Sequence, residues 1–240
     1  WKTPMAEAAL EIVDASAGYA GRIVLDAIRL SARKGELTAI VGPNGHGKST
    51  LLKAISGLVP VTSGEVRLHG SRIDRLRPDQ IVERGVIQVP QGDLLFPAMT
   101  VHENLLMGAY ANSGGLAERL DFVFALLPKL KERRNQTAGT LSGGERRMCG
   151  IGRGLMAGGE VLMLDEPSLG LAPIVIEQIY EVIFNLRREG RTILLVEENA
   201  ERIAEHADMI HLLDNGHIAW SGLGAELMAR PEIVETYLGV

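Results

Sequence analysis

One stretch of the chain has the composition of a phosphate-binding loop. Gly42-Pro43-Asn44-Gly45-His46-Gly47-Lys48-Ser49-Thr50 fits the pattern G-x-x-x-x-G-K-[ST]. Glycines let successive backbone N–H groups turn toward an anion, and a helix that begins here adds partial positive charge from its N-terminus. In this pattern Lys48 reaches the β- and γ-phosphates of a nucleotide, and Ser49 offers its hydroxyl to Mg²⁺. The candidate nucleotide-binding residues of the stretch are Gly42, Asn44, Gly45, His46, Gly47, Lys48, Ser49 and Thr50.

The alternative for this stretch is a glycine-rich turn with a surface lysine. A strand-like run precedes the loop and helical spacing follows it, which is the context that the phosphate-loop pattern requires. The context favours a nucleotide site.

Two carboxylates follow another short apolar run. Asp165 and Glu166 come directly after Val161–Leu164. A carboxylate at the carboxyl end of a strand beside a phosphate loop can hold Mg²⁺ through water, and the next one can polarise an attacking water. A strand that ends in a solvated acidic turn is the alternative, and it would be preferred if the phosphate loop were absent. With the loop present, we expect Asp165 to be a metal ligand and Glu166 to be catalytic.

A third motif, Leu141-Ser142-Gly143-Gly144-Glu145, lies just before a helical stretch. Ser142 and Glu145 alone would be explained as a capping box, S-x-x-E, at the start of that helix. A capping box does not need two glycines, however. Glycines in the first helical turn let a phosphate approach the exposed backbone N–H groups.

Together, GPNGHGKST, LDEPS and LSGGE resemble the ATP-binding cassette (ABC) family of ATPases, and the resemblance extends from Tyr19 to Gly239. In that family two cassettes meet head to tail, and ATP lies between the phosphate loop of one and the LSGG of the other. The resemblance implies that Ser142, Gly143 and Gly144 contact the γ-phosphate of ATP held by a partner chain. Lys48 and its neighbours would hold this chain's own ATP and Mg²⁺.

The resemblance also assigns roles to residues outside the three motifs. Tyr19 matches the aromatic residue that stacks on adenine, although a tyrosine in an ordinary turn is the alternative. Gln91 matches the glutamine that reaches Mg²⁺ and the attacking water and that couples the site to membrane subunits. An ordinary loop glutamine is the alternative there, but the position favours the functional role. Ser168–Leu171 matches the loop that crosses the interface between cassettes.

Three stretches resemble one group within the family. DEPSLGLAP, ILLVEENA and the tail RPEIVETYLG are similar to the ATPase subunits of branched-chain amino acid importers. This similarity implies a second cassette subunit as partner, in a heterodimer or a homodimer. It also implies integral membrane permease subunits, a periplasmic binding protein that acts indirectly, and a peripheral position on the cytoplasmic face of the membrane.

Several alternatives to this function stay open. Urea and amide importers share much of the pattern, and a lipid or lipopolysaccharide exporter cassette is compatible with LSGGERR. A soluble cassette in DNA repair or translation usually carries zinc cysteines, long insertions or tandem cassettes. This chain has one cysteine and one cassette, and its net charge of −5 does not indicate nucleic-acid binding.

The stretch TILLVEENAE departs from the family pattern. Most of the family carries a histidine after this strand that contacts the γ-phosphate, and here the position is Glu198. An ionised glutamate would repel the phosphate. Glu198 therefore turns away, is protonated, or makes this chain's own site hydrolyse poorly in a heterodimer; alternatively it caps the next helix with Asn199. Glu197 is expected to face solvent or a neighbouring loop.

These residues need a scaffold, and the bulk composition allows one. The 240 residues are 46 % apolar and 23 % charged, the ordinary mix of a soluble globular protein. Cys149 is the one cysteine, which excludes a disulfide within the chain and suits a reducing compartment. No run of about 18 apolar residues is present, and the first residues, WKTPMAEAAL, do not resemble a signal peptide. We expect a cytosolic chain, free or docked on a membrane complex.

The apolar patterns predict an α/β fold. Short apolar runs alternate with helical stretches, which favours a mostly parallel sheet covered by helices. The alternating pattern up to about Gly35 and at Gly64–His69 predicts short strands of an antiparallel layer. With the resemblance, we expect one domain over 5–240, with a P-loop NTPase core, an N-terminal antiparallel β subdomain and an inserted α-helical subdomain near 97–156. Asp214–His217 predicts a two-residue hairpin, and the tail predicts two short helices, the second starting at Pro231. The runs expected as core strands are Leu37–Val41, Val86–Val89, Val161–Leu164, Ile193–Val196 and Met209–Leu213.

Overall fold

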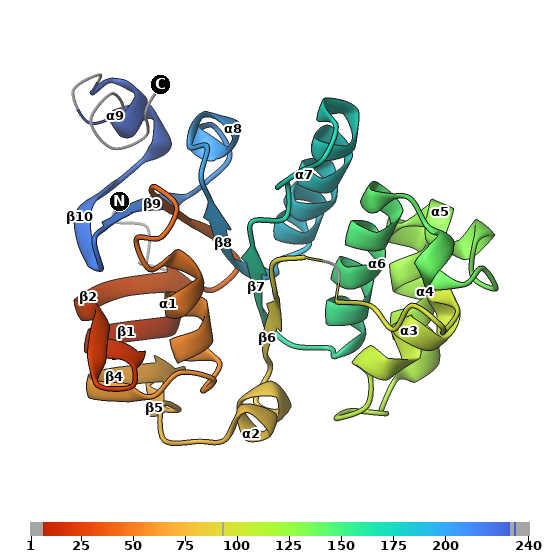
Figure 1. Ribbon diagram of the computed structural model, residues 1–240, viewed down its shortest axis with the longest axis horizontal. Helices are drawn as coiled ribbons and strands as arrows, with labels where there is room; N and C mark the ends of the chain where they lie inside the picture. Colours follow the sequence, from red (N-terminus) through yellow and green to blue (C-terminus); the bar gives the residue numbers. More distant parts are fainter. Residues whose placement is uncertain (1–6, 93, 231–232, 234–240) are drawn as a thin grey trace.

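The computed structural model of the protein describes residues 7–92, 94–230 and 233. Its strands form two sheets (Figure 1). The first is antiparallel, in the order β2-β1-β4-β5, and the second has the order β10-β9-β3-β8-β7-β6. The strands are β1 Ala8–Tyr19, β2 Arg22–Arg33, β3 Leu37–Val41, β4 Val61–Leu68, β5 Ser71–Arg72, β6 Val86–Val89, β7 Val161–Asp165, β8 Thr192–Glu197, β9 Met209–Asp214 and β10 His217–Gly222.

The second sheet is parallel except at one edge, where β10 pairs antiparallel with β9. Its strands are apolar on both faces because both faces are covered. In β3, Leu37 and Val41 pack into one hydrophobic cluster, and Ile40 between them packs into the other. Strand β3 lies between β8 and β9, which come from the last quarter of the chain.

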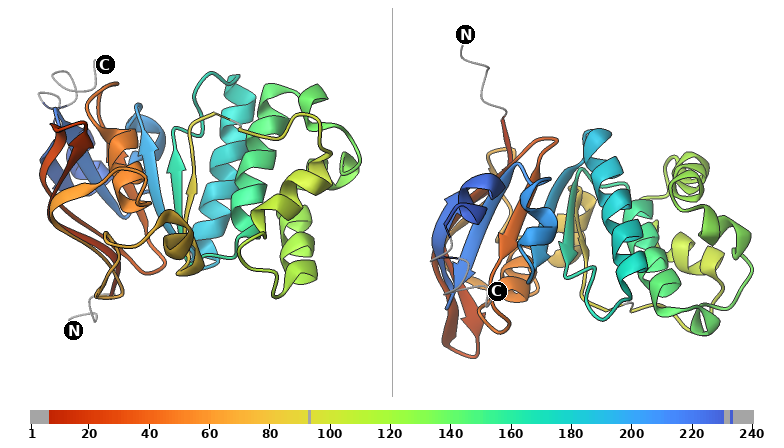
Figure 2. Two further views of the ribbon diagram at one scale, coloured as in Figure 1. Left: turned by 60° about the horizontal axis from the view of Figure 1, so that its bottom comes forward. Right: turned by 90° about the horizontal axis from the view of Figure 1, so that it is seen from above.

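Helices cover this sheet unequally. On one face, α1 packs with the antiparallel sheet, and on the other, α3 to α9 share one hydrophobic cluster (Figure 2). No helix among the described residues is long and apolar enough to cross a membrane. The helices are α1 Lys48–Ile55, α2 Pro78–Glu83, α3 Val101–Gly108, α4 Leu116–Leu126, α5 Pro128–Glu132, a 3₁₀ turn at Ala138–Thr140, α6 Gly143–Met156, α7 Pro173–Arg188, α8 Glu201–Ala204 and α9 Gly224–Met228.

Two glycines allow α6 to pack closely against its neighbours. A Cβ atom on Gly154 would lie 2.5 Å from Cγ2 of Val89, and one on Gly108 in α3 would lie 1.9 Å from the carbonyl oxygen of Arg153. Real Cβ atoms do not approach other atoms so closely, so glycine is required for this packing. The glycine content of α6, which is unfavourable for an isolated helix, is thus explained at Gly154 by the contact with β6.

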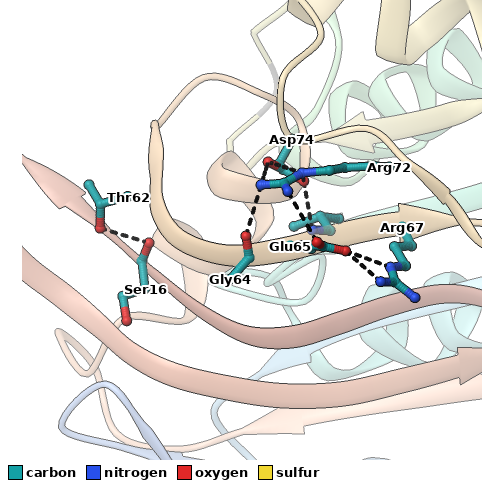
Figure 3. A network of polar contacts seen from close by, with 8 residues as sticks. Ser16, Thr62, Gly64, Glu65, Arg67, Arg72 and Asp74 are labelled. Carbon is teal, nitrogen blue, oxygen red and sulfur yellow. Dashed lines mark hydrogen bonds and ion pairs between the residues drawn. The ribbon is translucent and has the colours of Figure 1, made fainter.

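A polar network stabilises the hairpin of β4 and β5 at one edge of the antiparallel sheet (Figure 3). Arg72 donates to Asp74 through Nε at 3.0 Å and Nη2 at 2.9 Å, and to Oε1 of Glu65 at 3.1 Å. Burial acts to raise the pKa of Asp74, but the hydrogen bonds from Arg72 and from the backbone N–H of Val66, together with the charge of Arg72, lower that pKa. Thr62 donates to the carbonyl oxygen of Ser16 at 3.1 Å, which ties β4 to β1. These contacts position the antiparallel layer that carries Tyr19.

The predicted fold class is confirmed, with one difference in detail. Strands β1 and β2 have 12 residues each, so the expectation of short strands at the N-terminus was wrong. Between residues 12 and 18 of β1, bulges or irregularities shift its register against both neighbouring strands, β2 and β4. The Asn215-Gly216 turn joins β9 to β10 as predicted, with φ of 45° and 82° at its two residues. The second tail helix, from Pro231, lies outside the described residues.

Candidate functional site

The candidate phosphate-binding residues and acids meet where parallel strands end. The loop 42–47 follows β3, Asp165 ends β7, and Gln91 follows β6. Since β3, β8, β7 and β6 are neighbours in this order, their carboxyl ends lie along one edge of the sheet. A cavity of about 330 Å³ is lined there by Asn44, Gly45, Gly47, Lys48, Ser49, Thr50, Gln91 and Glu166.

Lys48 lies inside this loop with its ammonium group buried. Its Nζ donates to the carbonyl oxygens of Gly42 at 2.7 Å and Pro43 at 3.1 Å, and to Oδ1 of Asn44 at 3.3 Å. It also forms an ion pair with Oε1 of Glu166 at 3.3 Å. The amine is therefore held at the centre of the loop, beside the N-terminus of α1, whose first N–H groups have no partner within the helix.

Backbone geometry explains the glycine at the start of the loop. Gly42 has φ of 151°, and a Cβ atom there would lie 2.1 Å from the carbonyl oxygen of Leu213 in β9. The loop is thus pressed against the strand next to β3, and only glycine fits at this point.

Ser49 and Asp165 form a pair suited to a hard cation. The Ser49 hydroxyl donates to Oδ1 of Asp165 at 3.0 Å. Burial raises the pKa of Asp165, and the hydrogen bond from Ser49 only partly opposes this effect. A hydroxyl and a buried carboxylate in contact beside a phosphate loop fit Mg²⁺, which takes oxygen ligands and would favour the ionised carboxylate.

Glu166 is held at both carboxylate oxygens. Gln91 donates from Nε2 to Oε2 at 3.0 Å, while Lys48 pairs with Oε1. The backbone of Glu166 has φ of 45°, an unusual value for a residue other than glycine, and its N–H donates to the carbonyl oxygen of Val196 in β8 at 3.0 Å. Such strain persists only where the surroundings impose it, and it is common at active sites.

Tyr19 lies at a second cavity, of about 520 Å³, on the other side of Gly45. Its side chain is 46 % exposed, and His46 and the β9–β10 hairpin line the same cavity. Gly45 borders both cavities, so an elongated ligand could run from one into the other. Asn215-Gly216 was predicted as a turn, but nothing in its residues indicated that this turn borders the site.

Ser142, Gly143 and Gly144 do not join these residues. Ser142 and Gly144 line a separate cavity with α5 and α7, away from the phosphate loop. The capping box is present, because the backbone N–H of Ser142 donates to Oε2 of Glu145 at 2.9 Å. Ser142 is exposed and the two glycines are partly exposed, so the helix start remains accessible from outside.

The two acids Glu197, at the end of β8, and Glu198, directly after it, have different surroundings. Glu197 is 2 % exposed and faces Tyr180 and Ser168, so the expectation of a solvent-facing side chain was wrong, while that of a neighbouring loop was right. Burial raises the pKa of Glu197. Glu198 is exposed and lines one cavity with Glu166. Asn199, and not Glu198, supplies the contact at the start of α8, because its Oδ1 accepts from the N–H of Glu201 at 2.9 Å.

The chain is similar to known proteins over most of its length. The family model described as "ABC transporter" matches residues 25–169. The chain is 44 % identical to the high-affinity branched-chain amino acid transport ATP-binding protein BraG of Pseudomonas aeruginosa, over 92 % of this chain and 96 % of that protein. It is 40 % identical to the probable branched-chain amino acid transport ATP-binding protein LivF of Archaeoglobus fulgidus, over 96 % and 99 % of the two chains.

A solved structure has the same fold. The crystal structure of the ADP conformation of an ATP-binding cassette of an ABC transporter superposes with a TM-score of 0.84 at 28 % identity. The match covers 95 % of this chain and 97 % of the other.

Proposed function

The chain belongs to the ABC transporter family and is an ATPase of that family, and we propose that it drives the uptake of branched-chain or other hydrophobic amino acids. The observation that carries the proposal is the arrangement of Lys48, Gln91 and Glu166 around one cavity at the ends of the parallel strands. It combines a phosphate-binding loop with an oriented carboxylate, as ATP hydrolysis requires.

Each residue has a defined task in this proposal. The N–H groups from Gly45 to Thr50 and the Lys48 ammonium bind the phosphates of ATP, and Tyr19 stacks on adenine. Ser49, Asp165 and Gln91 would hold Mg²⁺, which neutralises charge on the phosphates when bound. Glu166 accepts a hydrogen bond from the attacking water and takes its proton, and Gln91 orients the carboxylate. When ATP arrives, Lys48 exchanges its contact with Glu166 for the phosphates, which frees one carboxylate oxygen for the water.

A second cassette completes the site. The accessible N-terminus of α6 with Ser142, Gly143 and Gly144 is far from this chain's own phosphate loop and suits a phosphate bound by a partner. The partner is a different ABC subunit or a second copy of this chain.

The proposals for the membrane partners and for the substrate rest on the names of the relatives and on one exposed apolar surface. BraG and LivF are described as branched-chain amino acid transport proteins. Close to Gln91 in the chain, Leu94 and Phe96 in the loop before α3 are 65 % and 42 % exposed. Met107 in α3 and Tyr110 just after this helix are also exposed. Such apolar exposure fits docking on permease subunits at the cytoplasmic face of the membrane. A periplasmic binding protein would deliver the amino acid without touching this chain.

Steady-state Mg-ATP hydrolysis across protein concentrations tests the ATPase site. We expect activity to rise more than linearly with concentration and to vanish in Glu166→Gln, which should still bind ATP because the phosphate loop is unchanged. Glu177→Gln, on the surface of α7, is a matched control and should keep wild-type activity. Activity of Glu166→Gln equal to that of the wild type would refute the assignment. Transport of labelled leucine by proteoliposomes with co-purified permeases tests the substrate, with urea and short amides as competitors.

Glu198 supports a second candidate, in which this chain's own site hydrolyses poorly. Its carboxylate shares a cavity with Glu166, so an ionised Glu198 would place a second negative charge near the γ-phosphate. In this case the α6 N-terminus would complete a competent site on a partner cassette, while the chain's own site mainly binds ATP. ATP binding without turnover at any protein concentration, with turnover restored by the partner, would favour this candidate.

A further inference from the structure

His46 occupies a position of the phosphate loop that contacts the β9–β10 hairpin. Its Nδ1 lies 2.8 Å from Oδ1 of Asp214, and its carbonyl oxygen accepts from the N–H of Gly216 at 3.1 Å. The hairpin is itself tied to β2, because the N–H of Asp26 donates to the carbonyl oxygen of Gly216 at 2.9 Å. The imidazole is therefore held by residues about 170 positions later in the chain.

Asp214 determines which nitrogen of His46 carries a proton. An ionised carboxylate only accepts hydrogen bonds, so Nδ1 must donate to it. The backbone N–H of Asn215, 3.2 Å from the same Nδ1, cannot be satisfied there at the same time. Because the carboxylate contact is shorter, we assign the proton to Nδ1. In the neutral ring this leaves Nε2 as a hydrogen-bond acceptor.

Nε2 has no hydrogen-bond partner among the residues that the structure describes, and the ring borders the cavity that contains Tyr19. Asn215 borders the same cavity. Its side-chain nitrogen Nδ2 donates to Oδ1 of Asp214 at 3.2 Å, which leaves its side-chain oxygen Oδ1 for a ligand. Two acceptors are thus presented beside the phosphate loop. A ligand at this place must offer hydrogen-bond donors.

The position of His46 within the nucleotide site indicates which donors these are. The triphosphate lies in the cavity around Lys48, and the base lies against Tyr19, beyond Gly45. His46 lines the Tyr19 cavity. In the phosphate loop it lies between Gly45 and Gly47, which both line the cavity around Lys48. In a nucleotide, the sugar lies between phosphates and base.

We propose that His46, oriented by Asp214, binds a ribose hydroxyl of the nucleotide and makes this site selective for nucleotides that carry that hydroxyl over the deoxy nucleotides that lack it. This inference rests on the proposed ATP site and specifies its selectivity. Asp214 is a positioning residue, because it acts through His46.

Equilibrium binding of ATP, 2′-deoxy-ATP and 3′-deoxy-ATP to the full chain tests the proposal. Loss of one neutral hydrogen bond should weaken binding by about 3- to 10-fold, so we expect one deoxy nucleotide to bind wild-type protein that much less tightly than ATP. Two amide variants separate the contact of Nδ1 with Asp214 from the contact of Nε2 with the ligand. In His46→Asn the amide can replace Nδ1 and keep the tie to Asp214, but nothing replaces Nε2. In His46→Gln the amide reaches the place of Nε2.

We expect His46→Asn to bind ATP and the deoxy nucleotide equally, and His46→Gln to keep part of the difference. His217→Ala, on the same hairpin but exposed and outside the cavity, should behave as the wild type. Equal binding of all three nucleotides by the wild type, or undiminished selectivity in His46→Asn, would overturn the inference while leaving the ATP site intact. No binding of ATP by the wild type would overturn the proposed function and this inference together.

Discussion

Replacing Lys48 by methionine should destabilise the nucleotide-free protein through Glu166. The two side chains are 3 % and 7 % exposed, and the change leaves a buried carboxylate without its cation. Breaking a buried ion pair on one side costs about 3–5 kcal/mol. We expect the lower end, about 3 kcal/mol, because Gln91 still donates to Glu166 and a cavity that water can enter lies beside the pair.

The partner mutation should behave differently. In Glu166→Gln, Lys48 keeps its three oxygen acceptors in the loop, so we expect a loss of about 1 kcal/mol or less. In the double variant no uncompensated carboxylate remains, and we expect it to be about 1–2 kcal/mol more stable than Lys48→Met alone.

Urea unfolding of the four proteins without nucleotide measures these free energies, provided that the m-values agree. A double variant whose loss equals the sum of the two single losses would refute the reasoning, because the ion pair would then not couple the residues. Lys53→Met, on the same helix but exposed, controls for the loss of a lysine and should change stability by less than about 0.5 kcal/mol.

Three further outcomes are expected. Glu198→His should raise ATP turnover per site severalfold if the carboxylate repels the γ-phosphate, and unchanged turnover would refute that repulsion. Burial lowers the pKa of His211 from 6.5 to about 4, so its contribution to stability is complete above pH 6.5 and is lost as the pH falls through about 4. Between these pH values we expect the free energy of unfolding, measured by urea titration, to fall by an amount on the order of 3 kcal/mol. His211→Asn, whose amide can still form a hydrogen bond with Ser221, should not show this fall. Gly154→Ala would place a methyl group 2.5 Å from Val89. Despite the better helix propensity of alanine, we expect it to lower the free energy of unfolding by about 1–2 kcal/mol at most, which calorimetry would detect as a lower melting temperature.

Local sequence patterns predicted the core strands well. Leu37–Val41 is a strand with the predicted limits, because a short run that is apolar except at Thr38 suits a strand that is covered on both faces. The Asp214–His217 hairpin followed from the need for positive φ at Asn215 and Gly216. The limits 97–156 for a helical subdomain stay a prediction.

Contacts between distant residues could not be predicted in the same way. The pair His46–Asp214 joins residues far apart in the sequence, and neither residue type indicates the other. Glu197 looked like a surface acid because the apolar run stops before it, yet β8 continues through it into a buried position. The phosphate loop was found from its own residues, while the contact of Lys48 with Glu166 needed the strand order.

The place of β3 in the sheet has a consequence for biosynthesis. The strand that carries the phosphate loop leaves the ribosome before its two neighbours, β8 and β9, which are made only after α7. Until then a fully buried apolar strand has both edges unpaired, which invites pairing with other chains. We expect nascent chains that stop before Met209 to lack ATP binding and to depend on chaperones, so a premature stop between β8 and β9 would yield aggregates and not a weakened ATPase.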